Sequence, residues 1–148
     1  MTDELRALQR RTAGAGAVLL VIAFATGALL AAAMTSKVDA DPHAVSAAHL
    51  NAIFGCLWLV ALAATLPLLR FGLTGARRLV LATALPAYAN WLVTTIKSFL
   101  YVPGVAFTGE RANDGVFVAL TVLVVVPSFA AAIAWAYGLL ARDAARAK

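Results

Sequence analysis

The sequence has few charged side chains and almost no cysteine. Only 13% of its 148 residues are Asp, Glu, Lys or Arg, whereas 63% are apolar. A soluble domain of this size needs a more polar surface, so the composition indicates a membrane protein. Cys56 is the single cysteine, which excludes an internal disulfide and any Cys-x-x-Cys redox motif.

The common catalytic motifs are also missing. The chain contains no Gly-rich phosphate loop, no Ser/His/Asp set, no His-Glu-x-x-His pattern and no evident internal repeat. The sequence therefore gives no sign of nucleotide binding, serine hydrolysis or zinc-dependent hydrolysis.

Four long apolar runs account for most of the chain, and they cover residues 12–34, 44–69, 79–101 and 115–140. Each is long enough to cross about 30 Å of hydrocarbon as a helix. We expect an all-α integral membrane protein, a four-transmembrane-helix bundle in which residues 1–148 form one membrane domain. Within the first run, Gly16 and Gly27 belong to a small-residue surface that favours close helix packing.

The basic residues cluster at alternate ends of these runs. Nine of the twelve Lys and Arg residues fall on one side of the membrane if there are four spans: Arg6, Arg10, Arg11, Arg70, Arg77, Arg78, Arg142, Arg146 and Lys148. The positive-inside rule places that side, and both termini, in the cytoplasm of a bacterial-type inner (cell) membrane. The pI near 10.0 therefore reflects membrane topology, and we expect no nucleic-acid partner.

His49 is the one histidine inside an apolar run, near the start of the second span. Ionisable side chains at such a depth are costly and often functional, so a metal or a cofactor is one interpretation. The other is a hydrogen bond to a carbonyl of a neighbouring helix. Ala52, Ile53 and Cys56 share its face and are small enough to leave room for a planar cofactor. His43, by contrast, is expected in the solvated outer loop.

The third span carries a polar stripe, made of Thr83, Asn90, Thr94, Lys97 and Tyr101 at helical spacing. Asn90 is too deep to reach water, so it must bond inside the protein. Lys97 has two interpretations: it extends to the outer interface, or it meets an anionic group such as a cofactor carboxylate. The outer loop at 102–114 could cap a site that opens near this interface.

Short segments resemble a family of small four-helix membrane isomerases. They are Ala48-His49, Tyr88-Ala89-Asn90-Trp91 and Pro127. The chain is similar to hydroxylaminobenzene mutase and, more distantly, to styrene oxide isomerase, from about Arg10 to Leu140. The resemblance implies a homotrimer with haem b at its subunit interfaces and His49 as the axial iron ligand. Lys97 and Tyr101 are then further cofactor-binding candidates.

The chain departs from the family at three positions. Gly55 stands where the family has an asparagine six residues after the histidine, and Pro86 and Thr94 stand where the isomerase branch has an acidic residue and a tyrosine. Asn51 lies one turn before Gly55 on the same face, so its amide could occupy the vacated space.

The resemblance implies rearrangement of an arylhydroxylamine to an aminophenol, or of an aryl epoxide to an aldehyde. Ferric haem would act as a Lewis acid, and Asn90, Thr94 and Asn51 would orient a small apolar aromatic substrate that partitions into the bilayer. A haem-bearing anchor for electron transfer is one rival, although such proteins usually ligate iron through two side chains. A small four-helix transporter is the other, although no Asp or Glu lies in a span.

Overall fold

The structure is a computed structural model, and it describes residues 3–140. Within this range every regular element is helical: α1 (Asp3–Met34), α2 (Pro42–Thr65), η1 (Leu66–Leu68), α3 (Leu73–Leu100), α4 (Arg111–Leu120), η2 (Thr121–Val125) and α5 (Val126–Leu140). The last three form one continuous rod. Four rods are therefore long and apolar enough to cross a membrane, which confirms the expected fold class.

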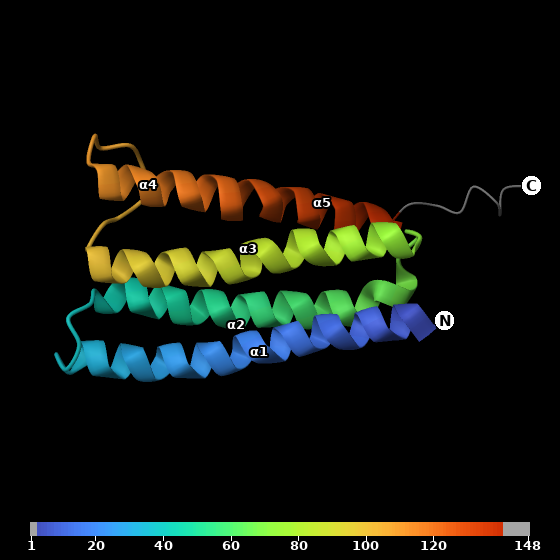
Figure 1. Cartoon of the computed structure of the whole chain (residues 1–148), viewed down its shortest axis with the longest axis horizontal. Helices are drawn as coiled ribbons and strands as arrows, with labels where there is room; N and C mark the ends of the chain where they lie inside the picture. Colours follow the sequence, from blue (N-terminus) through green and yellow to red (C-terminus); the bar gives the residue numbers. More distant parts are fainter. Residues whose placement is uncertain (1–2, 141–148) are drawn as a thin grey trace, which may run out of the picture.

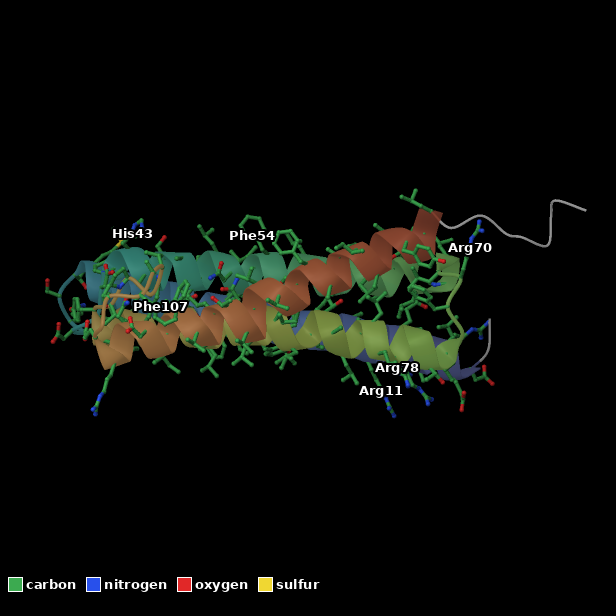
Figure 2. The ribbon with its side chains drawn as sticks, turned by 90° about the horizontal axis from the view of Figure 1, so that it is seen from above. Arg11, His43, Phe54, Arg70, Arg78 and Phe107 are labelled. Carbon is green, nitrogen blue, oxygen red and sulfur yellow. The ribbon has the colours of Figure 1, made fainter. Side chains whose placement is uncertain are left out.

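The four rods run antiparallel in chain order (Figure 1). Each packs on the next, α1 also contacts α3, and the rod of α4, η2 and α5 packs mainly on α3. Figure 2 shows this last rod crossing the others obliquely. At one end α4 packs on α3 and on the loop after it, through Val93, Val102 and Val116. At the other end, Trp135 of α5 donates a hydrogen bond to Thr65 of α2, at 3.0 Å.

Proline explains two local features of the helices. Pro67 has no N–H for a helical hydrogen bond, and α2 gives way to the short 3₁₀ turn η1 after Thr65, four residues before the expected end of the span. Pro127 follows a π-helical turn, η2, in which Val126 donates its N–H to the carbonyl of Thr121. Sharp bends in helices occur at prolines and at π-helical turns, and such turns are frequent at functional sites.

The close packing of α1 on α2 depends on the two glycines that the sequence suggested. A Cβ at Gly16 would lie 3.2 Å from the carbonyl oxygen of Cys56, and one at Gly27 would lie 3.1 Å from the ring of His49. Around them, Leu19, Ala23, Ala52 and Leu59 form the main buried cluster. The expected small-residue surface is therefore a helix interface.

The ends of the bundle differ in charge. Arg11, Arg70 and Arg78 lie at one end, and His43 and Phe107 lie at the other (Figure 2). We call these the basic end and the outer end. The structure thus brings basic residues of α1 together with those of the connection between α2 and α3 and the start of α3, as the positive-inside argument requires. Arg142, Arg146 and Lys148 lie outside the described residues, and the assignment of the basic end to the cytoplasm stays a prediction.

Candidate functional site

His49 is held against α1. Its Nδ1 lies 2.8 Å from the carbonyl oxygen of Ala23, and the ring packs over Gly27. A neutral imidazole that bonds a carbonyl through Nδ1 does so as the N–H donor, so its Nε2 carries the lone pair. The structure therefore contains the carbonyl bond that was one of the two interpretations of His49.

That bond leaves Nε2 unused. Among residues 3–140, Nε2 has no hydrogen-bond partner. Every fully buried side-chain nitrogen or oxygen in this range has one. It follows that Nε2 is at least partly accessible, as the intermediate burial of His49 also indicates. Metal-ligating histidines commonly donate their other N–H to a carbonyl or a carboxylate, which fixes the tautomer and the ring orientation. The two interpretations of His49 are thus compatible.

The buried neighbours of His49 leave no room for a cofactor inside the chain. Ala52 is fully buried and Cys56 almost so, because Leu19 and Ala23 of α1 pack on them. Ile53, also on this face, is only half-buried. A planar group bound to Nε2 would therefore lie on the lipid-facing surface of α1 and α2 rather than between the helices.

The polar residues of α3 meet α2 on a different side. Asn51 uses its Nδ2 to donate to Oδ1 of Asn90 and to Oγ1 of Thr94, both at 3.1 Å. Thr94 in turn lies 3.4 Å from the same oxygen of Asn90. We call Asn51, Asn90 and Thr94 the amide cluster. The structure thus brings together the three residues that the sequence analysis assigned to substrate orientation.

Gly55 occupies a crowded position one turn deeper than Asn51. A Cβ there would lie 2.6 Å from a methyl group of Leu19 and 3.2 Å from Cβ of Ala87. An asparagine at this position would have to displace the packing of α1 and α3 on α2. The amide of Asn51 therefore provides the polar group on this face of α2. It lies one turn nearer the outer end than Gly55, where Asn90 and Thr94 of α3 are its partners.

His49 and the amide cluster lie on opposite sides of α2. Residues two apart in an α-helix are separated by about 200° around its axis. His49 accordingly faces α1, whereas Asn51 faces α3. Within one chain, helix α2 itself therefore lies between the two sites.

Lys97 and Tyr101 lie farther out, with His43. Together they line a cavity of about 410 Å³ whose walls come from the start of α2, the end of α3 and the loop after it. Lys97 donates from Nζ to the carbonyl of Pro103, at 3.1 Å, and Tyr101 donates to Asp39, at 2.5 Å. Lys97 lies beside Ala44 and Ala47, on the side of α2 away from His49, whereas Tyr101 reaches the loop between α1 and α2.

His43 belongs to α2 rather than to the preceding loop. Pro42 is the first residue of the helix, and the Asp41 side chain accepts the backbone N–H of His43, at 2.9 Å. Proline at the first helical position and aspartate before it are a common start for a helix. His43 is exposed in this first turn, as a solvated residue should be.

Sequence reasoning missed Asn113, which organises the outer loop. It is fully buried, accepts the N–H of Gly104 at 2.8 Å and donates to the carbonyl of Ala106 at 2.7 Å. The next residue, Asp114, accepts the backbone N–H groups of Thr108 and Gly109. An Asn-Asp pair directly after a glycine-containing loop was the available signal.

Tyr88 and Trp91, from the segment that carries the resemblance, join α3 to α1. Tyr88 donates to the carbonyl of Ala15 at 2.7 Å, and Trp91 donates to Oγ1 of Thr26 at 2.9 Å. These aromatic side chains therefore position α3, and with it Asn90, relative to the other helices.

Comparison with known proteins identifies a family. The family model described as styrene oxide isomerase matches residues 8–140. No curated protein and no solved structure matches the chain. The matched range contains α2, α3 and every residue of the amide cluster, together with His49.

Proposed function

The chain belongs to the styrene oxide isomerase family, and we propose that it is a haem-dependent membrane isomerase that converts an arylhydroxylamine to an aminophenol. Membership in the family makes it an isomerase. Conversion of an aryl epoxide to an aldehyde is the second candidate, because the family is named for the isomerisation of an epoxide. Neither reaction needs an added reductant.

His49 is the residue that would hold haem. Its Nδ1 bonds the carbonyl of Ala23 and its Nε2 is free and at least partly accessible, which is the donor arrangement of a metal-ligating imidazole. Among the described residues, no three His, Cys, Asp or Glu side chains gather into a metal site. A single imidazole suits a metal whose other ligands belong to a prosthetic group. When bound, ferric haem would supply a Lewis acid for the substrate oxygen.

A homotrimer would complete the site. Nε2 opens onto the lipid-facing side of α1 and α2, and the amide cluster lies on the other side of α2. Two chains packed side by side would bring these groups to one substrate. We therefore assign His49 and the amide cluster at each site to neighbouring copies of the chain.

The hydrogen-bonding capacity of the amide cluster is the observation that favours an arylhydroxylamine. The bond between the two asparagines uses Nδ2 of Asn51 and Oδ1 of Asn90, which leaves one amide oxygen and one amide NH₂ without a partner. If both amides are turned over, so that their oxygen and nitrogen atoms exchange places, one oxygen and one NH₂ are again left without a partner. Since no fully buried side-chain nitrogen or oxygen in residues 3–140 lacks a partner, the free oxygen and the free NH₂ are both at least partly accessible.

An arylhydroxylamine matches that pair better than an epoxide does. Its N–H and O–H groups can donate to the free amide oxygen, and its oxygen can accept from the free NH₂. An epoxide only accepts, so the amide oxygen would stay unpaired beside it, and an unpaired polar group in a dry site is costly. The cluster contains no acid or base, so its role is to orient the substrate and to stabilise developing charge.

Product analysis tests the proposal. The purified protein is incubated separately with phenylhydroxylamine and with styrene oxide, without reductant, and the products are identified by chromatography and mass spectrometry. We expect an aminophenol of unchanged mass, together with a Soret band in the absorption spectrum. Aldehyde as the only product would select the second candidate, and turnover of neither compound would refute the proposed function.

A further inference from the structure

A groove of about 350 Å³ opens between α3 and α5 near the basic end of the bundle. Its size is within the usual range for small-molecule sites. The groove is lined by Phe71, Gly75, Arg78, Ala82, Ala130 and Ala134, above a floor of Leu79 and Ala131. It is distinct from the amide cluster and from the surface that exposes Nε2 of His49.

The groove is apolar and its wall is fixed in place. The ring of Phe71 lies against Gly138, where an added Cβ would come within 2.7 Å of it, and it stacks on Tyr137 with ring centroids 6.4 Å apart. Alanines and a glycine on the facing helices leave the space beside this wall unfilled. An apolar groove between two helices that can span a membrane offers a surface on which an acyl chain can pack.

Arg78 supplies the only charge among the lining residues. It is exposed and, among residues 3–140, has no ion-pair partner, whereas its neighbour Arg77 lies 3.9 Å from Glu4. Figure 2 shows Arg78 projecting from the basic end on the same side as Arg11. A guanidinium beside an apolar groove matches an anionic headgroup above an acyl chain.

The start of α3 adds a second attraction for an anion. Gly75 is in the first turn of α3, and the N-cap residue Gly72 has no side chain to accept the free N–H groups of this turn. Unpaired N–H groups and the helix dipole favour negative charge at this position. The first turn and Arg78 act on the same end of the groove.

We infer that this groove binds an anionic phospholipid from the leaflet at the basic end. One acyl chain lies along Ala82, Ala130 and Ala134, and the phosphate lies against Arg78. The complementary charge at headgroup depth favours a lipid over a second copy of the chain or an apolar substrate.

Native mass spectrometry of the full chain in detergent tests this inference, with phosphatidylglycerol and phosphatidylcholine of identical acyl chains as the probes. We expect phosphatidylglycerol to bind more tightly. Arg78→Gln should reduce that preference about fivefold, the scale of one basic residue at an anionic surface. Arg78→Lys should keep most of it, and Arg10→Gln, an exposed arginine on α1 outside the groove, should leave it unchanged. Ala134→Leu should fill the groove and weaken the binding of both lipids.

Several outcomes would overturn the inference. Equal binding of the two lipids, or a preference that survives Arg78→Gln, removes the headgroup contact. An equal loss in Arg10→Gln means that diffuse surface charge, not the groove, selects the lipid. If Ala134→Leu leaves lipid binding intact, or changes the number of chains in the particle, the groove holds something other than lipid.

Discussion

Nδ1 of His49 and the carbonyl oxygen of Ala23 lie 2.8 Å apart and join α2 to α1 at membrane depth. The bond fixes the imidazole and leaves Nε2 at the surface, so one contact serves both helix packing and the presentation of a ligand. It also places His49 on the side of α2 away from Asn51. The proposed reaction therefore depends on how copies of the chain assemble.

Haem binding should depend on His49 and hardly at all on His43. His49 offers a nitrogen whose orientation is fixed by α1, whereas His43 is exposed in the first turn of α2. His49→Ala should lose the Soret band, and His43→Ala should keep it. A full haem complement in His49→Ala, with loss in His43→Ala, would show that the ligand is misassigned.

Gly27→Ala should disturb the haem site more than the fold. Alanine favours a helix by about 1 kcal/mol over glycine. At Gly27, however, its Cβ would lie 3.1 Å from Cε1 of His49, so the ring must shift. We expect reduced haem occupancy or an altered spectrum. Gly14→Ala is the matched control, because nothing lies within 4 Å of the added carbon. Identical haem spectra for both variants would contradict the role of Gly27.

Asn90→Ala should reduce turnover by roughly 10²-fold while haem and the oligomer are retained, the scale of one lost polar stabiliser. If Asn90 only holds the fold, its removal instead takes away a hydrogen-bond partner of Asn51 and lowers the stability of the protein. Haem would then be lost in parallel. Haem content, oligomer size and product formation, measured on one preparation, separate these outcomes. Unchanged turnover would exclude Asn90 from the site.

Asn113→Ala should lower the free energy of unfolding by about 1–3 kcal/mol, because the N–H of Gly104 and the carbonyl of Ala106 lose their partner in a buried position. Thermal unfolding in detergent measures the change. Glu110→Gln, an exposed substitution in the same loop, is the control and should have little effect. Equal stabilities would mean that the loop does not depend on Asn113.

The basic end should face the cytoplasm, since it carries arginines of α1 and of the connection between α2 and α3 and the start of α3. Cys56 is buried and should react little with a maleimide, so the labelling of a single introduced cysteine reports on which side of the membrane it lies. In intact cells, a membrane-impermeant maleimide should label Lys37→Cys in the outer loop and spare Gly72→Cys in the inner loop. The reverse labelling pattern would invert the topology.

The sequence by itself determined the four spans and the grouping of basic residues. Both are local properties: an apolar run of sufficient length must form a helix in hydrocarbon, and alternate loops must share a side. It also determined that Asn90, Thr94 and Lys97 share one stripe of α3, because helical periodicity fixes angles around a single axis. The sequence linked Asn51 to these residues only indirectly, because Gly55 stands where the family has an asparagine.

Tertiary structure decided which helix each side of α2 faces. Periodicity places His49 and Asn51 about 200° apart, but it does not say that α1 packs on one and α3 on the other. That choice depends on the packing of all the helices, including the contacts of Gly27 and Trp91. The bond from His49 to Ala23 and the buried position of Asn113 likewise join segments whose proximity no local pattern encodes.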